Sequence, residues 1–313
     1  MNSPSNKIKV GIIQASPVFF DLEASLAKAV RYVGQAAAGG ARLVAFGETW
    51  LPGYPAWLDY CPDAALWNHE PTKDVFAQLR RNSIVVPGSE TETLAQAARD
   101  HKTSIVIGVN ERVDTGAGNG TLYNSLLIFN QNGKLTIHHR KLVPTYTERL
   151  VWGQGDGTGL AAAPTSAGRV GSLICWEHWM PLARQAMHES GEHIHVAVFP
   201  TVHEMHQIAS RQYAFEGRCF VLAVGLLMRV RDLPATLSKP AGMSDTPDAF
   251  VLRGGSSIIA PDGAYVVEPA YDEERIITAE IDLNAIDRER MTLDVTGHYH
   301  RPDVFDFRVR SDI

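Results

Sequence analysis

The sequence predicts an α/β fold built on a mixed β-sheet. Short apolar runs of strand length alternate with segments whose apolar residues recur at helical spacing. The turn residues Asn132-Gly133 and Pro261-Asp262-Gly263 join strand-like runs and predict two antiparallel hairpins. No linker-like composition interrupts the 313 residues. We therefore expect one domain over residues 1–313, with a polar C-terminal tail over residues 292–313.

The first half of the chain alternates strands and helices. Lys7–Ala15 is an almost continuous apolar run, which is typical of a buried strand. Asp21 is a good N-cap for a helix that ends at Gly39-Gly40. Two prolines and two glycines forbid regular structure over Gly47–Pro55. The other elements expected here are strand Arg42–Phe46, a helix near Glu90–Asp100, strand Ser104–Asn110, and a hairpin of Leu122–Phe129 with Lys134–His139.

The second half continues the alternation and closes with a hairpin. Its expected strands are Arg169–Cys175, Ile194–Phe199, Cys219–Leu227, Ser257–Ala260, Ala264–Val267 and Ile276–Ile281. Its expected helices are Met180–Glu189, Met205–Arg218 and the short Leu283–Arg290. The hairpin strands cannot all be parallel to their neighbours, so the sheet is expected to be mixed.

Composition excludes several classes of partner. The net charge of −6 argues against a nonspecific nucleic-acid binder, which needs clustered Lys and Arg. The longest strongly apolar run is Phe220–Met228, far short of the roughly 20 residues that span a bilayer. No apolar segment precedes Lys7, so a secretory signal is not expected. Three cysteines cannot all pair, and their scarcity suits a reducing, cytoplasmic location.

Several motifs resemble cofactor or metal sites without completing them. The glycine-rich segment 153–159 lacks the Gly-Lys-Ser/Thr ending of a phosphate-binding loop and is interpreted as a tight structural loop. His203-Glu204-Met205-His206 lacks the last histidine of a zinc helix. His193 and His195 have no obvious carboxylate or thiol partner. We therefore expect no metal site and no cofactor.

Cys175 stands apart from the other two cysteines. It ends a buried strand just before a helical segment, and such a position fixes a side chain while leaving one side open to a pocket. Cys219 begins an apolar strand and is expected to be a core residue, whereas Cys61 lies in a loop.

Four dispersed segments, in order, carry a family resemblance that spans about Lys7 to Phe307. They are Phe46–Pro55 (FGETWLPGYP), His139–Gly157 (HRKLVPTYTERLVWGQGDG), Leu173–Arg184 (LICWEHWMPLAR) and Thr296–Phe305 (TGHYHRPDVF). The chain resembles the nitrilase branch of the carbon–nitrogen hydrolase superfamily. The resemblance implies a four-layer αββα sandwich that pairs through its outer helices into a homodimer or a higher homo-oligomer.

The same resemblance implies a catalytic set of Cys175, Glu48 and Lys141, with Glu148 beside the lysine. A thiolate is a strong enough nucleophile for a nitrile carbon. Glu48 would take the thiol proton and later deliver it to nitrogen, while Lys141 and the main-chain N–H of Trp176 would stabilise developing charge. The reaction would pass through a covalent thioimidate and a thioester to the carboxylic acid and ammonia.

Each of these residues also has a plain structural interpretation. Glu48 would be a loop carboxylate, Lys141 part of a solvated basic cluster, and Glu148 a surface ion pair with Arg149. Glu177 is interpreted as structural, with an arginine as its expected partner.

Aromatic residues near the candidate site favour an aryl or arylaliphatic nitrile, with Tyr54 and Trp176 as substrate-binding residues. The full set is Trp50, Tyr54, Trp57, Tyr146, Trp152, Trp176 and Trp179. The alternative is that most of these tryptophans pack the core. Alternative functions are an amidase or a cyanide-hydrolysing relative using the same Cys-Glu-Lys site, and, more remotely, a non-catalytic binding protein on the same fold.

Overall fold

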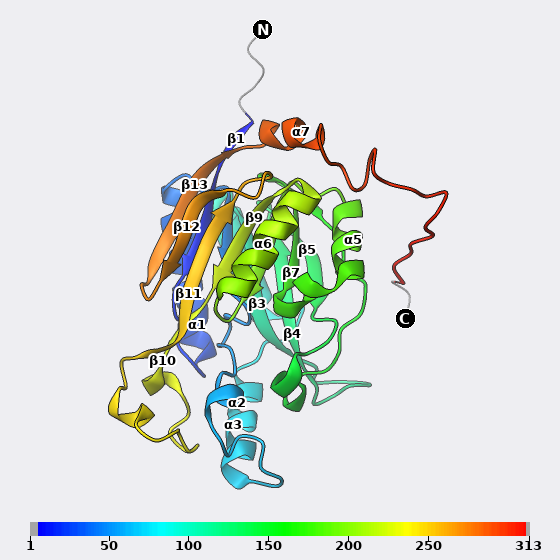
Figure 1. Cartoon of the computed structure of the whole chain (residues 1–313). Coiled ribbons are helices and arrows are strands. Elements are labelled where there is room, and N and C mark those ends of the chain that lie inside the picture. The colour runs from blue at the N-terminus through cyan, green and yellow to red at the C-terminus, as the bar shows by residue number, and fades with distance from the viewer. Residues whose placement is uncertain (1–5, 311–313) are drawn as a thin grey trace.

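The computed structural model describes residues 6–310 and contains two mixed β-sheets packed face to face (Figure 1). Residues 1–5, which bear on the expected lack of a secretory signal, lie outside the described residues, as do residues 311–313 of the expected tail. Within 6–310, no helix is both long and apolar enough to cross a membrane.

The first sheet has six strands in the order β13-β1-β2-β3-β4-β5. Strands β1, β2 and β3 run parallel, and the hairpin strands β4 and β5 and the late strand β13 are antiparallel to their neighbours. The strands are β1 (Lys7–Gln14), β2 (Leu43–Phe46), β3 (Ser104–Arg112), β4 (Leu122–Phe129), β5 (Leu135–Arg140) and β13 (Arg275–Asp282).

The second sheet has seven strands in the order β10-β11-β9-β8-β7-β6, and β12 pairs with β11. Its centre, β7-β8-β9, is parallel, and the outer pairs are antiparallel. The strands are β6 (Ala163–Thr165), β7 (Gly168–Ile174), β8 (Ile194–Phe199), β9 (Phe220–Gly225), β10 (Leu227–Arg229), β11 (Phe250–Ile259) and β12 (Tyr265–Tyr271).

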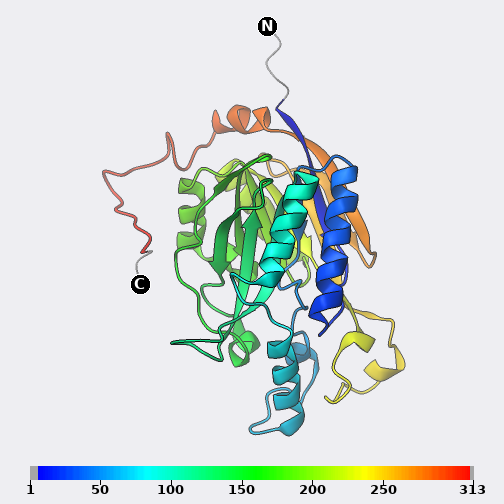
Figure 2. The same cartoon turned by 180° about the vertical axis from the view of Figure 1, so that it is seen from behind.

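Helices cover the outer face of each sheet. Helices α1 (Leu22–Ala38) and α4 (Ser89–His101) lie side by side over the first sheet (Figure 2), and α5 (Pro181–Glu189) and α6 (Glu204–Gly217) cover the second (Figure 1). Between the sheets, buried side chains of β1 such as Ile12 pack in one cluster with those of β9 such as Leu222. The predicted four-layer αββα sandwich is therefore confirmed.

Several elements differ from the prediction, including the unpredicted strands β6 and β10. Helix α3 (Glu70–Arg81) was not predicted, because only Val75 and Leu79 of its residues are buried and its apolar pattern is sparse. Strand β11 begins seven residues earlier than expected, at Phe250, because Gly254-Gly255 interrupts its apolar run. The remaining short helices are α2 (Trp57–Tyr60), η1 (Tyr146–Leu150), η2 (Cys175–Trp179), η3 (Val230–Asp232), η4 (Met243–Asp245) and α7 (Asn284–Arg290).

The glycine-rich segment 153–159 packs closely against the end of β5. A Cβ atom added to Gly155 would lie 2.1 Å from the main-chain oxygen of Arg140, and one added to Gly159 would lie 2.5 Å from Cα of His139. Glycine at these two positions thus permits the approach that a side chain would block. This agrees with a tight structural loop, and the loop follows directly on the segment that carries Lys141 and Glu148.

Candidate active site

Cys175 lies where β7 ends and the short helix η2 begins. Its φ of 51° is in the left-handed region, which is unusual for a residue with a side chain. The thiol is buried, and the main-chain N–H of the next residue, Trp176, acts to lower its pKa against the effect of burial. The chain thus turns sharply at Cys175, as the sequence position at a strand end suggested.

Glu48 follows β2 and is completely buried. Its Oε1 accepts hydrogen bonds from Nδ2 of Asn124 at 2.7 Å and from Nζ of Lys141 at 3.2 Å. Its Oε2 has no hydrogen-bond partner among the described residues. The backbone around it is tightly packed, since a Cβ on Gly108 would lie 2.4 Å from the main-chain oxygen of Gly47. Glu48 is therefore a fixed interior carboxylate, not a mobile loop side chain.

Lys141 follows β5, in the first sheet, and its side chain is buried together with two carboxylates. Nζ lies 2.6 Å and 2.9 Å from the two carboxylate oxygens of Glu148, in addition to its contact with Glu48. The main-chain N–H of Lys141 donates to the oxygen of Asn124, which ties it to β4. The interpretation of Lys141 as part of a solvated cluster is wrong.

Glu148 is also buried and has three kinds of donor. Besides Lys141, its carboxylate accepts hydrogen bonds from the main-chain N–H of Thr145 at 2.6 Å and from the hydroxyl of Tyr54 at 2.9 Å. Arg149 instead donates to the main-chain oxygen of Pro144. The alternative of a surface ion pair between Glu148 and Arg149 is therefore wrong, because the turn at η1 directs the two side chains to different surroundings.

Burial dominates the electrostatics of this group. It raises the pKa of the Glu48 carboxyl above its usual range, with a further contribution from the Glu148 charge, while Lys141 and Asn124 oppose the shift. Burial, Glu48 and Glu148 likewise hold the pKa of the Cys175 thiol well above its usual range. The two carboxylates and Cys175 raise the pKa of Lys141 against the effect of its burial. The resting site therefore holds a neutral thiol and a cationic lysine.

Glu177 joins the two halves of the site. Its carboxylate accepts hydrogen bonds at 2.7 Å from the main-chain N–H groups of both Leu142 and Ile174, and at 2.9 Å from Nε2 of His139. Leu142 follows Lys141, and Ile174 precedes Cys175. The structural interpretation of Glu177 fits these contacts. The expected arginine partner is wrong, because the sandwich places β5 and its His139 against this carboxylate.

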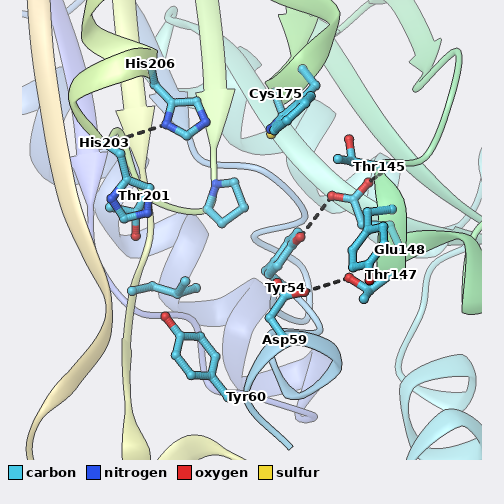
Figure 3. A pocket seen from close by; sticks show the side chains of 14 residues that line it. Tyr54, Asp59, Tyr60, Thr145, Thr147, Glu148, Cys175, Thr201, His203 and His206 are labelled. Carbon is cyan, nitrogen blue, oxygen red and sulfur yellow. Dashed lines mark hydrogen bonds between the residues drawn. The ribbon is translucent and has the colours of Figure 1, made fainter. Parts of the chain in front are cut away.

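A pocket of about 290 Å³ opens onto this group (Figure 3). Both expected substrate-binding residues, Tyr54 and Trp176, line it, together with Glu148 and Cys175. The other lining residues are Asp59, Tyr60, Thr145, Tyr146, Thr147, Pro200, Thr201, His203, His206 and Leu252. In Figure 3, Cys175 lies between Glu148 and Tyr54 on one side and the two histidines on the other.

Only part of the predicted aromatic set reaches this pocket. Three tryptophans, Trp50, Trp57 and Trp152, are buried in one hydrophobic cluster with side chains of the first sheet. Trp179 lies near the surface, outside the pocket. The alternative that tryptophans pack the core is thus correct for three of them. Sequence spacing could not separate the two groups, because residues of both groups lie side by side in the fold: the Trp176 and Trp179 rings are 5.6 Å apart, yet only Trp176 lines the pocket.

Sequence reasoning missed two features next to the site. Asn124 of β4 is a partner of Glu48 that no motif singled out. Glu192 lies 2.8 Å from Nδ1 of His195, so the expectation that His195 lacks a carboxylate neighbour is wrong. Across residues 6–310, no three His, Cys, Asp or Glu side chains are grouped as a metal ion would need. Cys61 and Cys219 are both buried and unpaired with each other or with Cys175.

Comparison with known proteins identifies the family. The sequence profile of the carbon–nitrogen hydrolases matches residues 9–290. The chain is 41% identical to an aliphatic nitrilase of Sinorhizobium fredii (strain HH103), over 96% of this chain and 94% of that protein. The chain belongs to the nitrilase branch of the carbon–nitrogen hydrolase family.

Further relatives extend this assignment. This nitrilase-branch chain is 38% identical to a bifunctional nitrilase/nitrile hydratase, NIT4B, of Nicotiana tabacum, over 99% of this chain and 88% of that protein. Among solved structures, a carbon–nitrogen hydrolase from Helicobacter pylori G27 superimposes with a TM-score of 0.68 at 19% identity, covering 95% of this chain and 97% of the other. At that identity the structural likeness supports the fold alone.

Proposed function

We propose that this protein is a nitrilase that converts an organic nitrile and two molecules of water into a carboxylic acid and ammonia. The observation that carries the proposal is the burial of Glu48, Lys141 and Glu148 in one hydrogen-bonded group whose charges act on the thiol of Cys175, at the wall of a pocket. The high identity to proteins named nitrilases supports the same activity.

Cys175 is the proposed nucleophile. Because its thiol is neutral at rest, the proton leaves as the sulfur attacks the nitrile carbon, and Glu48 accepts it. Glu48 is suited to this role since its raised pKa makes it a stronger base than an exposed carboxylate. The S–C bond forms, one C–N π bond breaks, and the proton passes from Glu48 to nitrogen, which yields a thioimidate.

Two hydrations complete the proposed cycle. Glu48 activates a water that adds to the thioimidate, then protonates the amine, and ammonia leaves with formation of a thioester. A second water, again activated by Glu48, cleaves the C–S bond, which releases the acid and restores the thiol. Lys141 stabilises negative charge on nitrogen and then on oxygen, and Glu148 orients the lysine through its two contacts. The Trp176 N–H is a second donor near the reacting carbon.

An aryl or arylaliphatic nitrile is the proposed substrate class. Tyr54, Tyr60, Tyr146 and Trp176 offer flat apolar surface around the pocket. The pocket volume is at the lower end of the range of about 300–1,000 Å³ typical of ligand sites, which favours a small substrate. The Sinorhizobium relative is named for aliphatic substrates, so the preference must be measured against aliphatic nitriles.

A second candidate outcome is release of the amide. The tetrahedral intermediate expels either ammonia or the Cys175 thiolate, and the second route gives an amide from the same residues. The tobacco relative carries both activities in its name. An amidase or a cyanide-hydrolysing enzyme would use the same Cys175, Glu48 and Lys141.

Ammonia release from phenylacetonitrile, phenylacetamide, adiponitrile and cyanide distinguishes these functions. We expect turnover of phenylacetonitrile with phenylacetic acid as the main product. Ammonia from the amide but from none of the nitriles would refute the nitrilase proposal, and faster turnover of adiponitrile would refute the aryl preference. Cys175→Ala should abolish turnover and covalent labelling, whereas Cys61→Ala, a matched change of a thiol outside the pocket, should retain both.

We also propose that the protein forms a homodimer or a higher homo-oligomer in a reducing cytoplasm. Helices α5 and α6 expose Leu182, Ile208 and Phe215 on the outer layer, and apolar side chains of this kind are typical of an interface between subunits. Three buried, unpaired cysteines suit a reducing compartment. Light scattering would test the oligomeric state, and a monomer at micromolar concentration would refute it.

A further inference from the structure

A buried row of polar side chains lies behind Cys175 and has no part in the mechanism above. It comprises His178 of η2, His195 of β8, Glu192 just before β8, and Tyr213 of α6, and all four are buried. Burying four polar groups is unfavourable unless each is hydrogen-bonded. These four groups therefore need hydrogen-bond partners inside the protein.

The row is continuous from α6 to the nucleophile. The Tyr213 hydroxyl bonds to Oε1 of Glu192, and Oε2 of Glu192 lies 2.8 Å from Nδ1 of His195. Nε2 of His195 lies 3.0 Å from Nε2 of His178. Nδ1 of His178 lies 2.7 Å from the main-chain oxygen of Cys175.

The last contact determines where the protons lie. A carbonyl oxygen only accepts, so Nδ1 of His178 must donate, and the Nε2 of a neutral His178 can only accept. Nε2 of His195 must then be the donor to it. The remaining contact, between His195 and Glu192, needs one more proton, carried either by Glu192 or by His195. The Glu192–His195 pair therefore holds two protons and is neutral overall.

We propose that His178 is a positioning residue that holds the Cys175 main chain in its left-handed conformation. His195 and Glu192 orient His178, and they do so only while the Glu192–His195 pair keeps both protons. If the pair loses one proton, one of two contacts is left without a proton to share. In the first case the Nε2 lone pairs of His178 and His195 face each other. In the second case the Nδ1 lone pair of His195 faces the Glu192 carboxylate. In the first case His178 can restore its link to His195 only by moving its proton to Nε2, which breaks its bond to Cys175.

The strain at Cys175 is the reason that this bond matters. The left-handed region is unfavourable for a residue with a Cβ atom and persists only where surrounding contacts hold it. Arg184 adds a second restraint on the same turn, since its Nη1 donates to the main-chain oxygen of His178 at 3.1 Å. The thiol thus depends on η2 for its direction towards the pocket.

The surroundings of the pair determine the pH at which the proton leaves. Burial raises the pKa of Glu192 to about 8, and His188 of α5 and Tyr213 of α6 oppose the shift. Burial and His188 lower the pKa of His195, while Glu177 of η2 opposes them. Burial, His195 and His206 of α6 likewise lower the pKa of His178. Since the protonated form of Glu192 is favoured, the positioning bond is present at neutral pH and lost as pH rises through about 8.

This inference rests on the proposed nitrilase activity, so its test includes a reaction that needs no nitrile. The kcat and KM for phenylacetonitrile are measured from pH 6 to 10, and Cys175 alkylation by iodoacetamide is followed by intact-protein mass spectrometry, with Cys175→Ala as the background. If the wild type hydrolyses no nitrile, the proposed function fails, but the alkylation rates still report on the nucleophile.

Two variants test His178. His178→Phe removes the bond to Cys175 and should lower kcat and the alkylation rate about tenfold with KM little changed. His178→Asn places an amide N–H where Nδ1 was, so it should restore most of the loss and remove the decline above pH 8. If His178→Phe matches the wild type, or His178→Asn is as slow as His178→Phe, the positioning role is refuted.

Two variants test Glu192. Glu192→Gln accepts from Tyr213 and donates its amide N–H to His195, which replaces the titratable proton with a permanent one. It should remain within about threefold of the wild-type kcat at pH 7 and shift the alkaline decline upward by at least about one pH unit. Glu192→Leu, which can make neither bond, should lower kcat about tenfold. An unchanged alkaline decline in Glu192→Gln would refute the requirement for the proton.

Discussion

Glu177 provides the most direct test of how the two sheets are aligned at the site. Glu177→Gln leaves one acceptor oxygen where the carboxylate had two, and turns an NH₂ group towards N–H donors. The wild-type carboxylate holds the N–H of Leu142 after β5 and the N–H of Ile174 in β7, so the substitution separates the two segments that carry Lys141 and Cys175.

The magnitude follows from the contacts. One hydrogen bond to a charged acceptor is lost, which amounts to about 1.5–3 kcal/mol, and one buried N–H is left without a partner at a cost of about 1–3 kcal/mol. Since His139 also loses its carboxylate partner, we expect the free energy of unfolding to fall by about 3–5 kcal/mol, which lies within the sum of these two losses. We also expect kcat to fall, because Lys141 and Cys175 are no longer held in register.

Urea unfolding at pH 7, followed by circular dichroism, measures the loss. Glu189→Gln is the matched control, because Glu189 is exposed on α5, and it should change stability by less than about 0.5 kcal/mol. The pKa of Glu177 is lowered by His139 and by the two N–H donors. The carboxylate therefore stabilises the fold above its unfolded pKa, and the difference between variant and wild type should shrink as pH falls through the lowered folded pKa. A loss below about 1 kcal/mol at pH 7 would refute the reasoning.

Four further predictions concern the acid limb of activity, the contact between Glu148 and Lys141, and the loop beside the site. Because Glu48 must be ionised to accept the thiol proton and its pKa is raised, kcat/KM should fall as pH drops through a value above the ordinary carboxyl range; a profile flat down to pH 4.5 would contradict this. Asn124→Leu removes a hydrogen bond to the ionised form and should move that limb to higher pH, whereas Glu148→Gln removes a repelling charge and should move it lower; shifts in the same direction would show that the charges act otherwise. Glu148→Gln should also lower kcat about 100-fold by weakening the hold on Lys141, as measured under saturating nitrile. Gly155→Ala would place a methyl group 2.1 Å from the Arg140 oxygen and should reduce stability by about 1–3 kcal/mol in urea titration, and an unchanged midpoint would mean that the loop relaxes freely.

Much of the fold could be predicted because its strands are buried on both faces. Such strands, for example β8 and β9, appear in sequence as continuous apolar runs, and the helices between them begin at recognisable residues such as Asp21, whose side chain accepts from the N–H of Ala24. Helix α3 was missed because it projects beyond the sheets and buries few side chains. Its formation depends on neighbours that are distant in sequence.

For the site, the sequence by itself determined the residue types and the family. Motifs around Glu48, Lys141 and Cys175 were sufficient for that, because each sits at the end of a strand whose local pattern is recognisable. The motifs could not say whether Glu148 is exposed or buried, because its partners Tyr54 and Lys141 come from two other segments.

Only the tertiary structure decided how these residues act on one another. Packing the two sheets brings the ends of β2, β5 and β7 together, and burial then raises the pKa of Glu48 and keeps Cys175 a neutral thiol. The row from Tyr213 to His178 likewise exists only because α6, β8 and η2 meet. Charge burial and hydrogen bonding between distant segments depend on three-dimensional proximity, which the order of residues does not contain.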